Sequence, residues 1–129
     1  MSKTKNIILW VLQVLLAAAF VFAGWPKLSG AQMMVDLFNT IGIGQWFRYV
    51  TGGLEVGSAV LLLIPGMAGI ATVLLTCVML GAILTHLAIL HNSPLDPFVL
   101  LVLTVFVLQG RWYQVAGLFG RAQASKAQL

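Results

Sequence analysis

Four ionisable side chains lie beside or within long apolar segments of the chain. Glu55 stands inside one such segment, Lys27 follows the first, and Arg48 and His86 lie near the ends of others. A carboxyl group, an ammonium and an imidazole placed together can hydrogen-bond a polar ligand or transfer its protons by general acid–base chemistry. Ionisable groups inside apolar segments are functional candidates by default. We therefore treat these four residues as a candidate ligand or proton site.

Several other chemistries are excluded by residues that the sequence lacks. Cys77 is the only cysteine, so no intrachain disulfide or Cys-x-x-Cys dithiol can form, and a redox role needs a bound molecule or a partner chain. His86 and His91 share no helix face with each other or with a carboxylate at metal-ligand spacing, so no metal site is expected. There is no nucleophile elbow and no glycine-rich phosphate loop. Without a complete catalytic set, enzymatic activity stays open.

The composition is typical of an integral membrane protein. Of 129 residues, 60% are hydrophobic and 8% are charged, about a third of the charged share in soluble domains. A soluble domain of this size cannot cover its surface with so few polar side chains, and a disordered chain would contain far fewer apolar ones. The net charge of +4 comes from scattered basic residues that form no patch, so nucleic-acid binding is not expected. The expected surroundings are a lipid bilayer.

Apolar runs and glycine–proline breaks predict an all-α fold, a single domain over residues 1–129. A helix needs about 20 residues to cross about 30 Å of hydrocarbon. The predicted spans of this four-transmembrane-helix bundle are about residues 7–24, 46–64, 70–90 and 97–113. A short interfacial helix is predicted between the first two spans, over 31–39, because Met33, Met34, Leu37 and Phe38 share one side of it. The polar tail, 122–129, is expected to be flexible.

Positive charge predicts how these spans are oriented. With four spans, both termini lie on one side of the membrane. That side carries Lys3, Lys5, Arg111, Arg121 and Lys126, whereas the other carries Lys27 and Arg48. Because loops rich in Lys and Arg stay in the cytoplasm, we expect both termini to be cytoplasmic, in a bacterial inner membrane.

Glu55 falls about halfway along the second predicted span, roughly 13 Å from its outer end. An acidic side chain there costs about 2.5–3.5 kcal/mol on insertion scales, so Glu55 must be neutral, paired or open to a water-filled pocket. Lys27, Arg48 and His86 all map to the outer half, whereas the inner half offers no titratable group except Cys77. This asymmetry predicts an outer polar pocket. The alternatives are a structural pair of Glu55 with Lys27 or Arg48, and a packing role for His86.

Other residues have structural interpretations with functional alternatives. Gly53 and Gly57 form a GxxxG motif that either packs within the bundle or mediates a homo-oligomer. Asp96, directly before a proline, is predicted to cap the fourth helix. Arg111 is predicted to extend outward and anchor the chain, with contact to anionic lipid or a ligand as the alternative. Cys77 is predicted to be inert packing.

Two segments resemble motifs of the DoxX-like family of membrane proteins. The run from Phe20 to Leu28 is similar to its F-x-x-x-G-x-x-K-L signature, with Lys27 as the lysine, and Gly53 to Gly57 resembles its second helix, with Glu55 at the centre. The order of the remaining features also agrees: Pro65-Gly66, a third helix with Met79 and His86, and a proline-led fourth helix that ends at Gly110 and Arg111. The likeness covers about residues 12–111 and implies a four-helix inner-membrane bundle with Lys27 and Glu55 as its polar signature.

The resemblance also implies candidate functions. Family members include subunits linked to thiosulfate:quinone oxidoreduction and others with redox or assembly roles. We expect a redox-associated subunit that binds a quinone, its possible cofactor, or another lipophilic molecule at the outer pocket, with a partner chain completing any reaction. The first alternative is a non-enzymatic scaffold or assembly factor. A small proton-coupled transporter is a second alternative, because small multidrug exporters also combine four spans with one membrane glutamate.

Overall fold

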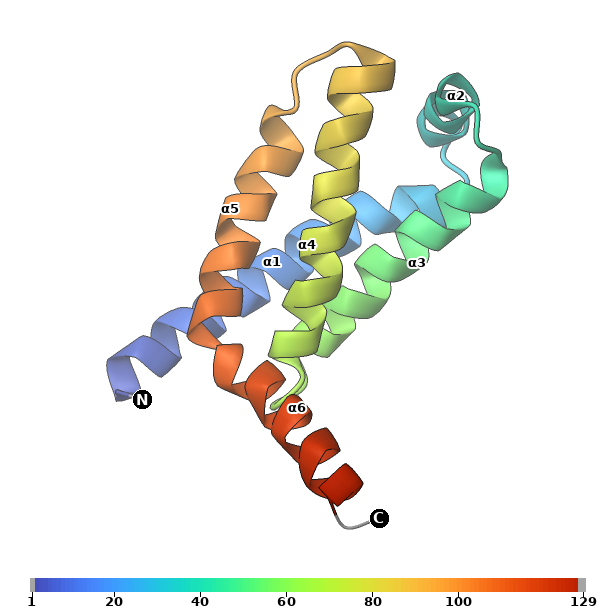
Figure 1. Ribbon diagram of the computed structural model, residues 1–129. Helices are drawn as coiled ribbons and strands as arrows, with labels where there is room; N and C mark the ends of the chain where they lie inside the picture. The colour runs from blue at the N-terminus through green and yellow to red at the C-terminus, as the bar shows by residue number, and fades with distance from the viewer. Residues whose placement is uncertain (1, 128–129) are drawn as a thin grey trace.

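The computed structural model describes the backbone of residues 2–127 and the side chains as far as residue 120, and this part is entirely helices joined by short turns (Figure 1). The elements are α1 (Lys3–Ser29), α2 (Gln32–Ile41), α3 (Gln45–Leu62), α4 (Ala68–Thr85), the π-helical turn η1 (His86–Leu90), α5 (Leu95–Gly110) and α6 (Trp112–Ala127). The all-α prediction is confirmed for these residues.

Helix α1 extends beyond its predicted end. The sequence predicted the first span to end at about Gly24, yet the helix continues through Pro26 to Ser29. Gly30, with a left-handed φ of 76°, terminates it, and the Pro26 carbonyl accepts hydrogen bonds from the N–H groups of Gly30 and Ala31. Membrane helices tolerate an internal proline where neighbours satisfy the freed backbone groups. Lys27 consequently stands on the last turn of α1 rather than in a loop.

The core lies where α1, α3, α4 and α5 meet. Its buried members come from all four helices: Leu9, Leu16, Phe20, Leu62, Leu75 and Val107 are at most 2% exposed. Large apolar side chains also remain outside, among them Phe22, Leu84 and Phe106. Helices α4 and α5 run side by side, and α1 crosses behind them (Figure 1). An apolar exterior over an apolar core is expected of helices that lie in lipid.

Not every predicted span reaches membrane-spanning length and hydropathy. Among the described residues, α1 and the continuous segment Ala68–Leu90 are long and apolar enough to cross a bilayer. Helix α5 and residues Trp112–Gly120 would form a third span if this pair, bent by 55°, is counted as one. Helix α3 is not among these candidates. The four-span bundle therefore remains a prediction.

The C-terminal third of the chain differs most from the predicted helix over 97–113. Helix α5 begins at Leu95, so Asp96 lies in its first turn and the predicted cap is wrong; Ser93 Oγ accepts the hydrogen bond from Leu95 N instead. Arg111 interrupts the helix with φ −108° and ψ 13°, and α6 then runs to Ala127. The predicted flexible tail is thus helical over 122–127, and its last two residues lie outside the described part.

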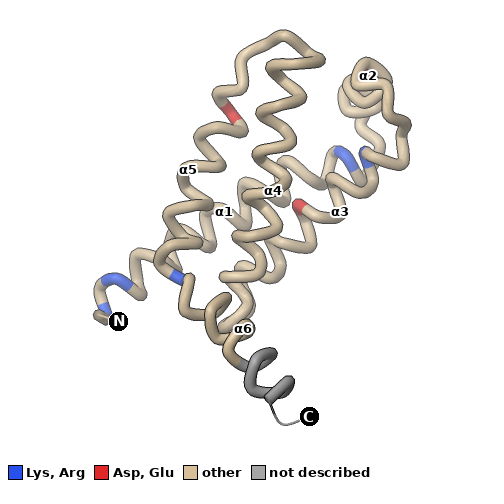
Figure 2. Tube along the Cα trace, viewed as in Figure 1, with Lys and Arg blue, Asp and Glu red and all other residues tan. Residues whose placement is uncertain are grey.

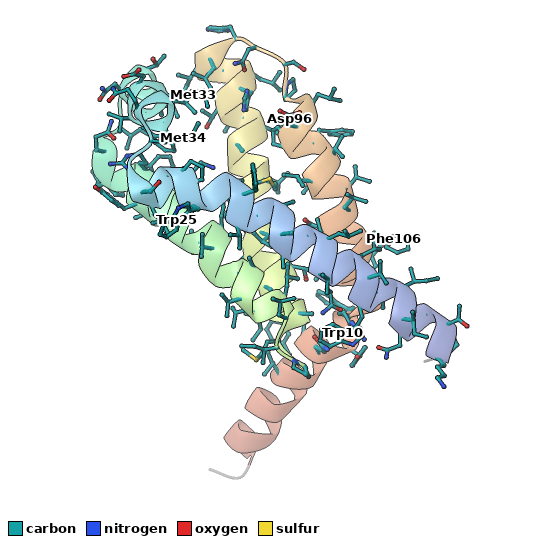
Figure 3. The ribbon with its side chains drawn as sticks, turned by 180° about the vertical axis from the view of Figure 1, so that it is seen from behind. Trp10, Trp25, Met33, Met34, Asp96 and Phe106 are labelled. Carbon is teal, nitrogen blue, oxygen red and sulfur yellow. The ribbon has the colours of Figure 1, made fainter. Side chains whose placement is uncertain are left out.

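Helix α2 and η1 face each other at one end of the molecule (Figure 1). Helix α2 covers most of the helix predicted over 31–39, whose position at the membrane interface stays a prediction, and Gly42, with φ 84°, terminates it. Phe38 is its buried residue and packs against Phe47 of α3, with ring centroids 5.9 Å apart; Met33, labelled in Figure 3, is 73% exposed. Opposite α2, the turn η1 is terminated by His91, whose backbone is left-handed with φ 52°. Such π-helical turns occur frequently at functional sites.

Candidate functional site

Two glycines bring α1 and α3 into close contact. A Cβ atom added to Gly24 would lie 3.0 Å from both Glu55 Cβ and the Gly52 carbonyl oxygen, and one added to Gly52 would lie 2.9 Å from Lys27 Cβ. Each glycine stands three residues before an ionisable residue on the same helix face. The Gly24–Gly52 contact therefore sets Lys27 beside Glu55.

The Lys27 ammonium donates to Glu55 Oε1 and forms an ion pair with it. The carboxylate is 1% exposed and the lysine 16% exposed. Glu55 Oε2 and Ser58 Oγ, one turn further along α3, are buried without a hydrogen-bond partner among the described residues. Of the two ion pairs left open by the sequence, the structure forms the one with Lys27, and the carboxylate retains one unused acceptor atom.

Arg48 lies close to this pair without joining it. Its Nη1 donates to the backbone carbonyl of Lys27, its Nε donates to Gln45 Oε1 at 2.7 Å, and its guanidinium carbon lies 4.3 Å from the centre of the Tyr49 ring. The last carbonyls of a helix lack intrahelical partners, and cations stabilise that end. Arg48 therefore caps the end of α1 and holds the backbone that carries Lys27.

A cleft of about 650 Å³ opens between α2, α3, α4 and η1, beside the ion pair. Lys27 and Thr51 contribute polar groups to its wall, and His86 lines it from η1. Most of the remaining lining is aliphatic or aromatic, including Phe38 of α2 and Val78 of α4. Ligand sites typically combine a largely apolar wall with a few placed polar groups in this range of volume.

His86 does not contact the ion pair. Its Nδ1 is hydrogen-bonded to Asn92 Oδ1, within the turn that joins η1 to α5. In the neutral tautomer that donates from Nδ1 to this amide oxygen, Nε2 is left as an acceptor. The predicted cluster is thus divided: Lys27 and Glu55 are paired, and His86 shares only the cleft with Lys27.

Cys77 is placed differently from the prediction. Its side chain is exposed and lines the cleft from α4, rather than being buried in the core. The helical period explains this, because Leu75 and Met79 take the buried positions on either side. The thiol therefore lies on the same wall as any ligand in the cleft.

A second polar cluster lies at the opposite end of the bundle, where the sequence predicted no titratable group except Cys77. Arg111 is 3% exposed and points inward, so the predicted outward anchor is wrong. Its Nε donates to Gln13 Oε1 and its Nη1 to Asn6 Oδ1, both at 2.8 Å, and to the Tyr113 hydroxyl at 3.1 Å. The guanidinium also faces the ring of Trp10, visible in Figure 3, at 5.7 Å.

Gln13 extends this cluster to a third helix. Its Nε2 donates to the Leu62 carbonyl at the end of α3, at 2.7 Å. Asn6 and Gln13 stand seven residues apart, which is two helical turns and one face of α1. That spacing of polar residues in an apolar run was the sequence signal for this cluster. The cluster joins α1, α3 and the α5–α6 bend.

These features define an α-helical membrane protein in which two helices are fastened by a buried ion pair beside an apolar cleft. The profile of the DoxX-like family matches residues 11–108, which is most of the chain. The chain therefore belongs to the DoxX-like family, and that prediction is confirmed. No curated protein and no solved structure gives a significant match.

Proposed function

We propose that this DoxX-like protein binds a quinone or another lipophilic carbonyl compound in the cleft between α2, α3, α4 and η1. The observation that carries the proposal is a single one: the Lys27 ammonium, held by a buried carboxylate, stands in the wall of an otherwise apolar cleft. A fixed cation in an apolar wall is suited to a molecule with an apolar body and one polar end.

The polar groups of the cleft have complementary roles toward such a ligand. Lys27 donates a hydrogen bond to a carbonyl oxygen, and charge-assisted bonds of this kind are the stronger ones. His86 Nε2, which is an acceptor, can take the hydrogen bond of a hydroxyl group after reduction. Glu55 holds the ammonium in place through its ion pair. Because the single cysteine cannot form an intrachain dithiol, electrons in this proposal come from a partner subunit.

Replacing His86 by asparagine is expected to weaken binding of the reduced, hydroquinone form about fivefold, because His86 Nε2 accepts from a hydroxyl group and one neutral hydrogen bond contributes about 1 kcal/mol. The matched control is His91→Asn, since His91 does not line the cleft and asparagine tolerates its left-handed backbone. Binding of a short-chain hydroquinone, kept reduced under anaerobic conditions, to the purified protein in detergent is followed by quenching of tryptophan fluorescence. Equal effects of the two substitutions, or no binding by the wild-type protein, contradict the proposal.

A second candidate function, a membrane scaffold, is favoured by the outer face of α3. Cβ atoms added to Gly53 and Gly57 would meet nothing within 4 Å in the described structure. Gly52, not the GxxxG pair, packs against α1, so the expected packing role of Gly53 and Gly57 within the bundle is wrong. Small residues on an unoccupied helix face permit close approach of a second membrane helix.

Substituting Gly53 by leucine is expected to abolish a homo-oligomer formed through this face, because the added side chain separates the two backbones. Gly81→Leu on α4 is the control, as Gly81 is also unobstructed. Cross-linking in native membranes followed by electrophoresis measures the oligomer. A wild-type protein that remains monomeric, or an oligomer that persists with Gly53→Leu, contradicts this function.

We also propose that both termini are cytoplasmic, in a bacterial inner membrane. Figure 2 shows two groups of basic residues, one near the N-terminus and the α5–α6 bend and the other near the start of α3. The group near the termini is larger when the C-terminal Arg121 and Lys126 are included. Alkaline phosphatase fused to the C-terminus should be inactive, and fused within the α2–α3 turn it should be active; the reverse pattern contradicts this orientation.

A further inference from the structure

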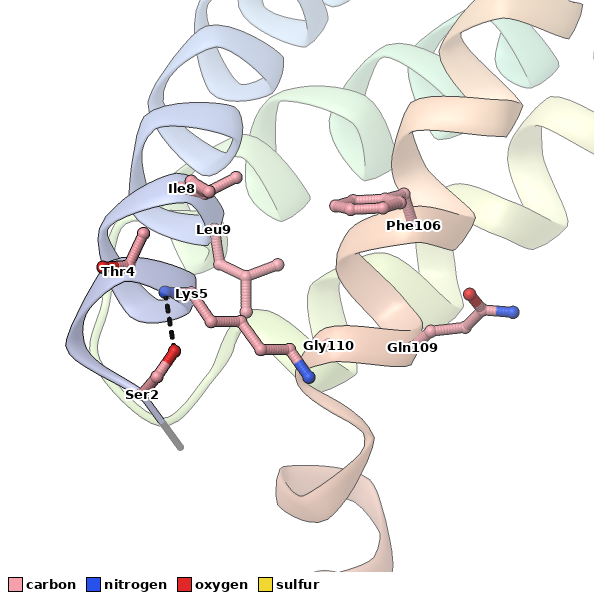
Figure 4. Close-up of a pocket in the computed structure, with 8 residues that line it drawn as sticks. All are labelled: Ser2, Thr4, Lys5, Ile8, Leu9, Phe106, Gln109 and Gly110. Atoms are coloured by element: carbon pink, nitrogen blue, oxygen red, sulfur yellow. Dashed lines mark hydrogen bonds between the residues drawn. The ribbon is translucent and has the colours of Figure 1, made fainter.

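A second cavity, of about 380 Å³, lies at the end of the molecule remote from the ion pair. Figure 4 shows that its lining comes from the first turns of α1 and the last turn of α5. The two helices touch at the base, where a Cβ atom on Gly110 would lie 2.6 Å from Leu9 Cδ2. Arg111, the next residue, fixes this contact through its bonds to Asn6 and Gln13. Beyond it, the first turn of α1 continues past the end of α5 and the cavity opens.

The lining of this cavity is layered. Ile8 and Phe106 form an apolar level next to the contact, and they are 49% and 54% exposed. Ser2, Lys5 and Gln109 form a polar level at the rim. In Figure 4 the Lys5 side chain extends toward Gly110 at the end of α5. The Phe106 ring lies further along α5, at the level of Ile8. A phospholipid has the same order of layers, a polar headgroup above apolar chains.

The charge at this rim has one sign. Lys5 lines the cavity and Lys3 lies on the same helical turn, whereas the three acidic residues of the chain stand on α2, on α3 and at the far end of α5. Ser2 Oγ already accepts from the Lys5 backbone N–H, so its hydroxyl hydrogen is left to donate. A basic group with a hydroxyl donor between two membrane helices matches an anionic headgroup.

We infer that this cavity between α1 and α5 binds a phospholipid with an anionic headgroup. The phosphate and headgroup lie against Lys5 and Ser2, and an acyl chain follows Ile8 and Phe106 down the outside of the α1–α5 contact. The positively charged Lys5 favours lipids with a net negative charge, which zwitterionic lipids lack. This site is separate from the cleft and does not depend on the quinone proposal.

The test uses the full chain, delipidated in a non-ionic detergent and titrated with phosphatidylglycerol or phosphatidylcholine. Retained lipid is measured by native mass spectrometry. We expect phosphatidylglycerol to be retained in preference, and Lys5→Gln to lower its affinity roughly fivefold, the contribution of one lysine near a headgroup, without changing phosphatidylcholine binding. Lys3→Gln is the matched control, because Lys3 is on the same turn but does not line the cavity.

Two further measurements distinguish lipid binding in this cavity from two alternatives, nonspecific attraction of anionic lipids to basic residues and binding of a soluble anion. Phe106→Ser should lower the affinity for both lipids, and Ile8→Ser provides the same measurement on the other helix. Glycerol 3-phosphate should compete only weakly, since it lacks acyl chains. Equal losses for Lys3→Gln and Lys5→Gln, no preference for phosphatidylglycerol, or displacement of the lipid by glycerol 3-phosphate at comparable concentration would each overturn the inference.

Discussion

Glu55→Gln is expected to lower the free energy of unfolding by about 3 kcal/mol and to abolish quinone binding. The substitution leaves the Lys27 ammonium next to a neutral amide, and breaking a buried pair on one side costs about 3–5 kcal/mol. We expect the lower end because Lys27 remains 16% exposed and borders the cleft. Denaturant unfolding in detergent measures the stability, and quenching of tryptophan fluorescence by a short-chain quinone analogue measures the binding.

The controls for this prediction separate stability from ligand recognition. Asp36→Asn removes an exposed carboxylate that accepts only from Gln32 on its own helix, and it should change neither quantity. The double variant Lys27→Met with Glu55→Leu removes both charges, and well-packed apolar replacements of buried pairs are often neutral in stability. It should recover the lost stability and still fail to bind. A double variant that binds the quinone normally would contradict the role assigned to Lys27.

Arg111→Leu is expected to have the second large effect, a loss of about 3 kcal/mol in the free energy of unfolding. The substitution removes the donors that serve Gln13 Oε1 and Asn6 Oδ1, and each buried acceptor left unsatisfied costs about 1–3 kcal/mol. Gln109→Leu, an exposed change two residues before Arg111, is the control. Denaturant unfolding in detergent again gives the measurement.

Adding a second substitution identifies the cause of that loss. Gln13→Leu combined with Arg111→Leu removes the unsatisfied side-chain acceptor and should recover part of the stability. Recovery stays incomplete, because the Leu62 carbonyl loses its hydrogen bond from Gln13 Nε2. If Arg111→Leu unfolds like the wild-type protein, Arg111 does not hold α1, α3 and the α5–α6 bend together.

The sequence was sufficient to predict the family, the helical class and the pairing partner of Glu55 as one of two alternatives. Lys27 and Glu55 could be singled out because a charge in an apolar segment has few stable arrangements. The choice of Lys27 over Arg48 depended on where α1 ends. The sequence predicted an end at about Gly24, and only the surrounding contacts show that the helix passes through Pro26.

Other features depended on tertiary contacts that a local motif does not show. The GxxxG motif pointed to Gly53, but Gly52, about 100° away around the helix, is the residue that meets α1. Arg111 follows an apolar run, a position from which most arginines extend to the interface. It turns inward because Asn6 and Gln13, roughly a hundred residues earlier, offer it acceptors. The spacing of those two residues was visible, although not their partner.

The length of α1 has a consequence for how the protein responds to its surroundings. Its 27 residues extend about 40 Å, of which the uncharged stretch 6–26 accounts for about 32 Å, close to the roughly 30 Å of hydrocarbon, and α1 crosses α4 obliquely (Figure 1). The two helices cannot both stand along the bilayer normal, so at least one of them is tilted in the membrane. A thinner membrane is expected to increase that tilt. If α1 is the tilted helix, we expect bilayer thickness to act on its contact with α3 at Gly24 and Gly52.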